Sequence, residues 1–530
     1  MKNINFKLIC VLFAVFFAVS CSKDFLERPS LSEISTENFY QTKEELRLAT
    51  AGLYAGKVWG EYHNRAIIAI GDVLGGNLVL PWGGQDLVEL NTFTLSGTND
   101  RLVSCWKGLY FVVGHCNATI NGIENAPATI AEADKNAAIA EARFIRAMAY
   151  YHLVMTWGEV PIYEDYAELI SSPLVNKNIV ADGYRFITED LIFAAENLPE
   201  TDEKGRVTSW SAKGLLSKVY LTMAGLGQSG GTRNQEYLDL AKNYAKDVIE
   251  NSGSVLLPSY KDLFKTQFND NPESLFALQW TSPSGGWGEG NMNLTMSPSN
   301  DIVPQKELAF GGPSPSYDLY LAYTEQDSIR RKATIMLPGD YYEELNAAEG
   351  GYTCTLPAMK KHIIGNEVDN NFPAMTTLSS IEHNSLLRLA DVYLIYAEAI
   401  LGNNASTTNA EALLYFNMVR ERAGVDPLTE LNTDIILKER RLEFACEGQY
   451  WYDLVRLSYY NPVKAIEVLN TQISNDIRVR FDYDEDTEIA TPNDPIGIIT
   501  PASVGTFTLQ LPSLEIIANP KLNEPAVPYY

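Results

Sequence analysis

Aromatic side chains in glycine-rich segments are the residues of this sequence whose types best suit ligand chemistry. They are Trp82, Trp287, Trp59 and the adjacent Tyr341 and Tyr342, with Asn77, Gln85 and Asp86 as polar neighbours of the first. A flat ring stacks on the apolar CH face of a sugar, and amide and carboxylate groups bond to its hydroxyls. The pattern predicts a saccharide site built from loops; the alternative is that these rings pin the loops to the body of the protein.

Two carboxylates seven residues apart, Asp391 and Glu398, are candidates for the acid and base of a glycosidase. Seven residues on one helix place the two backbones roughly 10 Å apart, farther than the ~5–5.5 Å of retaining pairs and the ~6.5–9.5 Å of inverting pairs. Possible ionic partners are Arg388, Arg420, Arg440 and Arg441. We therefore favour ion pairs between helices over catalysis, and we assign no catalytic residue.

Metal and phosphate motifs are weak in this sequence. The five histidines show no HExxH and no paired spacing, and His152 lies on an apolar helical stripe that favours a core position. The match of Gly225, Gly227 and Gly230 to GxGxxG follows a predicted helix instead of a strand, which indicates a turn. The acidic run 482–488 lacks the register of an EF-hand and indicates a solvated loop. The sequence predicts neither a metal site nor a cofactor.

The amino terminus has the pattern of an export signal. Lys2 and Lys7 precede an apolar run over 8–19, which is shorter than the about 20 residues that cross a bilayer, and a small residue stands before Cys21. This order resembles the lipobox of bacterial lipoproteins and predicts a signal peptide over 1–20 with a lipid anchor on Cys21. The alternative is an ordinary cleavage near Ser20. No later segment is long and uncharged enough to span a membrane.

Composition separates binding from other functions. The formal net charge of -26 opposes contact with the phosphates of nucleic acid, which we exclude as a partner. Aromatic residues (29 Tyr, 20 Phe, 8 Trp) far outnumber the 5 histidines, which favours stacking over imidazole chemistry. The cysteines are too few for a disulfide scaffold. Cys105 and Cys116 could pair if the chain bends near Gly108 and Gly114, whereas a continuous helix would hold them roughly 16 Å apart, too far for a bond.

Helical periodicity predicts the elements that position these residues. Apolar stripes predict helices over 136–155, 182–198, 211–226, 237–250, 386–401 and 410–423. We expect a mainly α fold: a tetratricopeptide-like helical-repeat scaffold over about 136–260 and 384–460, with a large loop-rich insertion containing little β structure. Glycine-rich composition predicts ligand loops over about 58–101 and 281–380. Residues 21–530 are expected to form a single domain.

Several segments resemble the SusD/RagB family of outer-membrane lipoproteins of Bacteroidetes-type bacteria. The matching segments are Cys21 with 24–29, 38–40, 141–151 (EARFIRAMAYY), 157–161, 388–399 (RLADVYLIYAEA), 419–424 (VRERAG), 439–448 (ERRLEFACEG), 451–456 and 511–520. They occur in the family's order and approximate spacing over nearly the whole mature chain. The ligand loops carry little family signature, so no binding residue transfers by match.

The resemblance implies a lipid-anchored protein on the outer membrane that faces the medium. It implies capture of glycans for a TonB-dependent SusC-like transporter, without catalysis. Other members of the family bind peptides, so capture of a peptide or another nutrient is the alternative within the same architecture. A surface glycoside hydrolase is the alternative from another class.

Overall fold

The computed structural model of the chain describes residues 39–80, 84–280, 290, 292–307, 309–376 and 380–530. The predicted signal peptide, Cys21, Trp82 and Trp287 lie outside these residues. Within the described part of the chain, no helix combines the length and the apolar character needed to cross a membrane.

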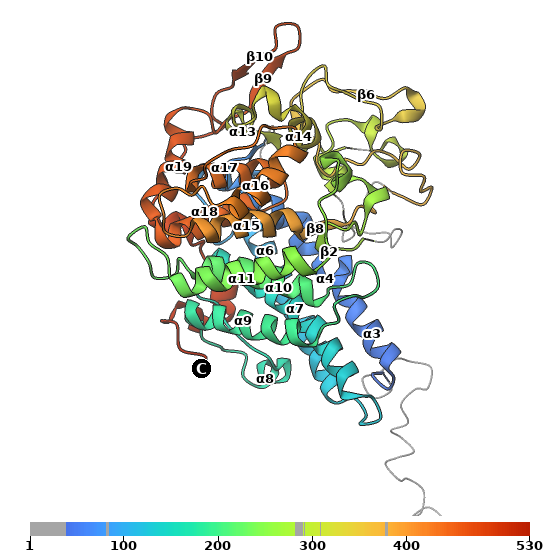
Figure 1. The fold of residues 1–530 in the computed structure, drawn as a ribbon, viewed down its shortest axis with the longest axis vertical. Coiled ribbons are helices and arrows are strands. Elements are labelled where there is room, and N and C mark those ends of the chain that lie inside the picture. Colours follow the sequence, from blue (N-terminus) through green and yellow to red (C-terminus); the bar gives the residue numbers. More distant parts are fainter. Residues whose placement is uncertain (1–38, 81–83, 281–289, 291, 308, 377–379) are drawn as a thin grey trace, which may run out of the picture.

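Two groups of helices form the scaffold (Figure 1). The first group contains α6 (Asp100–Glu124), α7 (Glu132–Trp157), α9 (Val180–Asn197), α10 (Ser209–Met223) and α11 (Gln235–Asn251). The second group contains α15 (Leu389–Leu401), α16 (Ala410–Arg422), α17 (Thr433–Phe444), α18 (Tyr450–Tyr460) and α19 (Pro462–Ser474). Most helices that follow one another within a group pack together, α17 packs on α15, and α11 packs on α15, which joins the two groups. The prediction of a mainly α, helical-repeat scaffold is confirmed.

Helix α7 shows why these segments fold as they do. Its alanines and aromatic residues cover more than one face, and the helix is buried along most of its length between α6 and α9. It ends at Gly158, whose φ of 70° suits glycine at the end of a helix. His152 lies on the buried stripe beside the hydroxyl of Tyr62, 3.1 Å from Nδ1, and burial lowers its pKa to about 3. The prediction of a core histidine is confirmed.

The segment predicted as one helix over 386–401 begins as a strand. Residues Asn384–Arg388 form β8, which pairs antiparallel with β2 (Ser274–Leu278), and α15 starts only at Leu389. A short apolar run fits the periodicity of a strand as well as that of a helix, so Leu386 and Leu387 did not reveal which of the two forms here. Pairing with β2, more than 100 residues earlier in the chain, decides it.

The segment over 58–101 was predicted as a long loop, and this prediction is wrong. It contains α4 (Gly56–Tyr62), π-helical turns over His63–Ile67 and Ala69–Val73, strand β1 (Leu78–Val79) and α5 (Gln85–Thr92). Gly71 explains the misleading composition: a Cβ on it would lie 2.2 Å from the carbonyl carbon of Gly448. The glycine permits close contact between two backbones here and does not make a turn.

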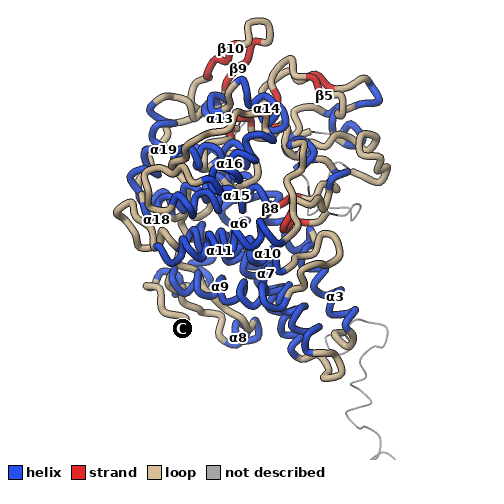
Figure 2. Tube along the Cα trace, in the orientation of Figure 1, coloured by secondary structure: helices blue, strands red, loops and turns tan. Residues whose placement is uncertain are grey.

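Between α11 and α15 the described chain consists of loops joining short elements, as Figure 2 shows by its few strands. The helices are α12 (Met292–Met296), α13 (Tyr317–Ala322) and α14 (Ser328–Thr334). The strand pairs are antiparallel and include β3 (Ser314–Pro315) with β1, β4 (Ile335–Met336) with β7 (Ala358–Met359), and β5 (Tyr341–Tyr342) with β6 (Tyr352–Thr353). The acidic run lies in a projecting hairpin of β9 (Phe481–Asp484) and β10 (Ile489–Pro492).

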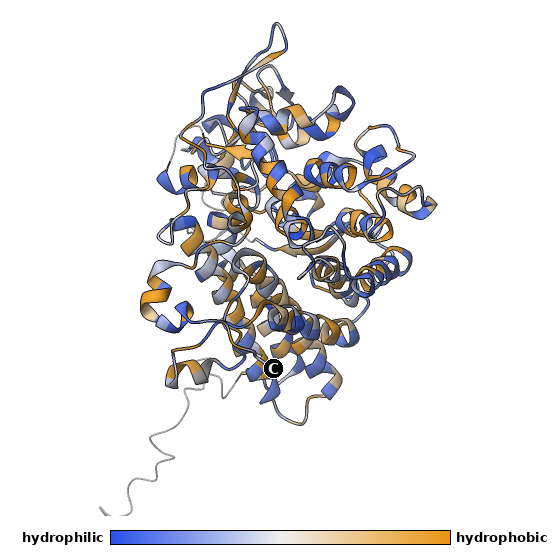
Figure 3. Ribbon diagram, turned by 90° about the vertical axis from the view of Figure 1, so that its left-hand side faces the viewer, coloured by the Kyte–Doolittle hydropathy of each residue, from blue (hydrophilic) through white to orange (hydrophobic). Residues whose placement is uncertain are grey.

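Three further helices lie outside the two groups and the loop-rich region. They are α3 (Lys43–Ala51), α8 (Tyr166–Ser171) and α20 (Ser513–Ala518). Helix α3 begins with a capping box in which Thr42 and Glu45 satisfy each other's backbone N–H groups. Polar and apolar residues interleave along the helices (Figure 3), and one hydrophobic cluster extends from Leu46 to Leu509.

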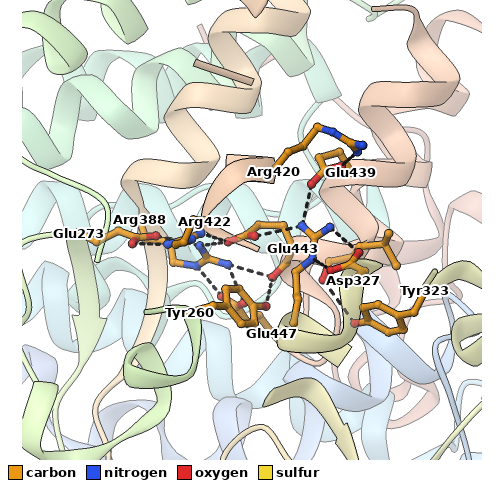
Figure 4. Close-up of polar contacts among 12 residues, drawn as sticks. Tyr260, Glu273, Tyr323, Asp327, Arg388, Arg420, Arg422, Glu439, Glu443 and Glu447 are labelled. Atoms are coloured by element: carbon orange, nitrogen blue, oxygen red, sulfur yellow. Dashed lines mark hydrogen bonds and ion pairs between the residues drawn. The ribbon is translucent and has the colours of Figure 1, made fainter. Parts of the chain in front are cut away.

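A buried ionic network fastens the loop-rich region to the scaffold (Figure 4). Its cations are Arg330, Lys361, Arg388, Arg420 and Arg422, and its carboxylates are Glu273, Asp327, Glu439, Glu443 and Glu447. Glu443 is at the centre: it binds Arg388 (2.5 Å), Arg330 (3.3 Å) and Arg422. Burial alone would raise the pKa of Glu443, but the three guanidinium groups overcome that effect and hold the pKa at about 2.

The two candidate acids on α15 are also paired. Asp391 binds Lys218 at 2.8 Å and Arg440 at 2.7 Å. Glu398 binds Arg233 at 2.8 Å and Arg456 at 2.5 Å, and these cations outweigh burial and lower its pKa to about 2. Both carboxylates are buried. The prediction of interhelical ion pairs is confirmed.

Candidate functional site

A cavity of about 260 Å³ lies where the first helices meet the loop-rich region. The π-helical turns supply one wall through His63, Asn64 and Ala69. The start of α5 and the first turn of α6 supply the next, with Asp86 and Arg101. Helix α12 and the segment 310–313 close the other side, where Phe310 is 43% exposed. The cavity thus combines an accessible aromatic ring with charged and amide side chains, as ligand pockets do.

The charged wall is fixed by the start of α6. Asn99 caps this helix and also donates from Nδ2 to the backbone oxygen of Asp86 at 2.7 Å. Arg101 donates from Nε to Oδ2 of Asp86 at 2.7 Å. Arg65 binds Asp100 and donates to Ser104 at 3.1 Å. The wall therefore presents fixed hydrogen-bond donors and acceptors whose charges are balanced.

A smaller cavity of about 30 Å³ adjoins the first and shares His63, Ile68 and Met292 with it. Such a volume holds little more than water. His63 packs on Trp280 with ring centroids 4.7 Å apart, and its pKa falls to about 3, mainly because it is buried. His362 is the opposite case: burial would lower its pKa, but the carboxylate of Glu382, 3.1 Å away, raises it.

The carboxylates that line the two cavities are each bound to a cationic or histidine side chain. Asp86 binds Arg101, Asp270 binds His383 at 3.0 Å, Glu382 binds His362, and Glu447 binds Arg388 and Lys361. The described residues contain no cluster of three or more His, Cys, Asp or Glu side chains that could hold a metal ion. The arrangement suits hydrogen bonding to a polyhydroxyl ligand better than proton transfer.

Arg478 supports this site from behind. Its buried guanidinium donates to the backbone oxygens of Val73 (3.0 Å), Leu74 (2.9 Å) and Asn91 (2.8 Å), at the carboxyl ends of the second π-helical turn and of α5. Burial is the main cause that lowers the pKa of Arg478 to about 9, which leaves it charged at neutral pH. A cation at helix carboxyl ends is favourable, so this residue joins the two segments that carry the cavity walls.

Of the residues predicted to contact ligand, Trp82 and Trp287 lie outside the described residues, and the others separate into three groups. Asp86 lines the cavity. Trp59 and Asn77 have no exposed surface: the indole donates to the oxygen of Leu53 at 2.9 Å, and the amide binds Asp72 and Arg441. A ligand cannot reach them in this structure, and their assignment as contacts is corrected to packing. Trp59 lies in helix α4 and Asn77 in the tightly packed bend before β1, so neither belongs to an open loop.

The tyrosine pair lies away from both cavities. Tyr341 is 56% exposed and donates from its hydroxyl to the oxygen of Gly350 at 2.9 Å. Tyr342 is buried and donates to the oxygen of Lys332 at 3.1 Å. Neither lines either cavity. Sequence reasoning also missed Phe310, although the glycines and proline that follow it, at 311–313, are the signal that selected the other rings.

Sequence comparisons give similar proteins over the whole chain. A sequence model of the SusD family matches residues 265–530, and one described as "Starch-binding associating with outer membrane" matches residues 24–221. A SusD-like protein of Bacteroides ovatus is 37% identical, with 99% of this chain and 98% of that protein covered. SusD-like protein P25 of Formosa agariphila is 26% identical, with 85% and 89% covered.

Solved structures share the fold. A crystal structure with xylogluco-oligosaccharide is 37% identical, has a TM-score of 0.84, and covers 92% of this chain and 99% of its own. A laminarin-binding SusD-like protein is 24% identical, with a TM-score of 0.64 over 82% of this chain and 94% of that one. The second of these similarities extends to the fold alone.

Proposed function

This chain belongs to the SusD family, and on that premise we propose that it is a glycan-binding lipoprotein of the outer membrane that captures oligosaccharides without catalysis. The observation that carries the proposal is the 37% identity, over nearly the whole chain, to a structure with xylogluco-oligosaccharide. The cavity beside Asp86 supports it, since it offers an aromatic ring and fixed polar groups to a sugar. The captured glycan then passes to a TonB-dependent SusC-like transporter.

The proposed contacts with the glycan come from cavity residues and from two tryptophans that lie outside the part of the chain that the structure describes. Asp86 and Arg101 bond to hydroxyls, and Phe310 offers an apolar face. Trp82 and Trp287 provide the main stacking rings; Trp82 is separated in sequence from the cavity residue Gly84 only by Gly83. The acidic net charge of the protein favours a neutral glycan over one rich in carboxylates or sulfates.

Replacing both Trp82 and Trp287 by alanine is expected to weaken oligosaccharide binding at least about tenfold, because each ring contributes stacking of ~0.5–1.5 kcal/mol beyond the surface that it buries. Isothermal calorimetry with xylogluco- and laminari-oligosaccharides, preceded by a glycan-array screen, measures the loss. Tyr341→Ala is the matched control, since this exposed tyrosine lies outside the cavities. Unchanged affinity in the double variant would show that Trp82 and Trp287 do not stack on the sugar. Binding of peptides alone by the wild type would favour the peptide alternative, and hydrolysis of the sugar would favour the enzyme.

The membrane anchor is tested separately. Cys21→Ala removes the thiol that carries the diacylglycerol, so the protein is expected to leave the membrane fraction, because stable anchoring needs more than one acyl chain. Cell fractionation followed by immunoblotting checks this, with Cys105→Ala as a control that keeps the anchor. A variant at Cys21 that stays in the outer membrane would contradict lipidation at this residue.

A further inference from the structure

A second groove lies on the outer side of α6 and shares no residue with the two cavities of the candidate site. It is open, with a volume of about 550 Å³, within the range of ~300–1,000 Å³ that is usual for ligand pockets. Its floor begins at Trp106 and continues along the helix to Ala118. Tyr163 and Glu515 face it from two other segments.

Aromatic rings form the walls of this groove and are held in place. Tyr110 and Tyr163 stack with ring centroids 5.8 Å apart and an interplanar angle of 13°, and the Tyr110 hydroxyl donates to the oxygen of Pro161 at 2.8 Å. Phe111 is 51% exposed and meets the ring of His115 edge to face at 4.5 Å. Phe111 belongs neither to the hydrophobic core nor to the partly buried residues packed against it, so core packing does not account for its ring.

Polar side chains beside these rings are free to bind a ligand. Lys107, His115 and Glu515 make no side-chain hydrogen bond or ion pair with any residue that the structure describes. Burial lowers the pKa of His115, so at neutral pH its ring offers one donor and one acceptor. The groove therefore supplies a cationic donor, a carboxylate acceptor and a neutral imidazole around an aromatic surface.

We infer that this groove is a second saccharide site, which takes a short stretch of a neutral glycan. A sugar ring has apolar CH faces for Phe111 and Tyr110 and hydroxyls for Lys107 and Glu515. A hydrocarbon chain would desolvate those two charges without replacing their hydrogen bonds. A polyanion would face Glu515 and the acidic net charge. The site stands on its own residues and does not need the cavity beside Asp86.

The test compares full-length chains that carry Cys21→Ala on a glycan array and in calorimetry, with xylogluco- and laminari-oligosaccharides as probes. Phe111→Ala is expected to lower the affinity for at least one neutral oligosaccharide about tenfold or more, while Phe111→Trp retains it. Because Phe111 is exposed, thermal unfolding should stay unchanged.

The outcomes separate this inference from the proposed function. Loss of all binding in the Trp82→Ala, Trp287→Ala variant, with no effect of Phe111→Ala on any glycan, would overturn the second site and keep the first. If Phe111→Ala loses binding while the Trp82→Ala, Trp287→Ala variant binds as the wild type does, the result supports the second site and counts against the site beside Asp86. If Phe111→Ala changes only the association with another protein, the groove is a protein contact and the inference is wrong.

Discussion

Replacing Glu443 by alanine is expected to lower the free energy of unfolding by about 3–5 kcal/mol, the usual cost of removing one partner from a buried ion pair. The side chain is fully buried and binds Arg330, Arg388 and Arg422, which come from three different segments. Without it, three guanidinium groups remain in the interior with too few carboxylates. Urea unfolding followed by tryptophan fluorescence measures the loss.

A matched surface pair and the pH dependence make this prediction specific. Asp239→Ala removes an exposed partner of Lys242 and should change stability by no more than about 1 kcal/mol. The pKa of Glu443 is about 2 in the folded protein, below the ~4.3 of an unfolded glutamate, so its contribution is present above about pH 4.3 and is lost as the pH falls toward 2. Glu443→Gln removes the titrating group, so the free energy of unfolding should depend less steeply on pH in this range. If Glu443→Ala were as stable as the wild type and Glu443→Gln kept the wild-type dependence of stability on pH, the network would be dispensable.

The helices were predictable from sequence because their signals are local. The apolar stripes of α7 and α15, and the spacing of Asp391 and Glu398 on the latter, depend on a period of 3.6 residues that any α-helix imposes. The partners of those carboxylates were only partly foreseeable. Arg440 was named as a candidate, whereas Lys218 and Arg233 approach from helices or turns that only the fold brings near.

The site was less predictable because glycine has two uses. At Gly158 it ends a helix with positive φ, which is the use that local rules for helix ends expect. At Gly71 it allows contact with Gly448, a residue far away in the chain, and the same reasoning mistakes a packed helical segment for a loop. Trp59 was assigned to ligand for this reason. Asp86 was found, but its partner Arg101 and the opposite wall at Phe310 come together only in the folded chain.

Replacing Arg478 by methionine is expected to weaken oligosaccharide binding about tenfold and also to destabilise the protein. Methionine fills similar space but leaves the backbone oxygens of Leu74 and Asn91 without the guanidinium donor, at ~1–3 kcal/mol for each buried group left unpaired. The oxygen of Val73 loses one of two donors, since it also accepts from the N–H of Gly76. Val73 lines the cavity beside Asp86, and Asp86 itself lies at the start of α5, the helix that contains Asn91. The variant therefore removes the side chain that joins the Val73 wall of the cavity to the Asp86 wall. Calorimetry with the oligosaccharide bound by the wild type measures the affinity.

A control variant with a similar loss of stability shows whether Arg478 positions the cavity walls or only stabilises the fold. Leu238→Ala in α11 removes a fully buried side chain far in sequence from the cavity walls and should cost ~2–5 kcal/mol while leaving affinity unchanged. Arg478→Lys keeps the charge but cannot reach all the carbonyl oxygens at once, so its affinity should fall between those of the wild type and Arg478→Met. If Arg478→Met and Leu238→Ala bind equally well, the buried guanidinium stabilises the fold without shaping the site. If only the arginine variant loses affinity, the walls of the cavity depend on the carbonyl oxygens that this residue holds together.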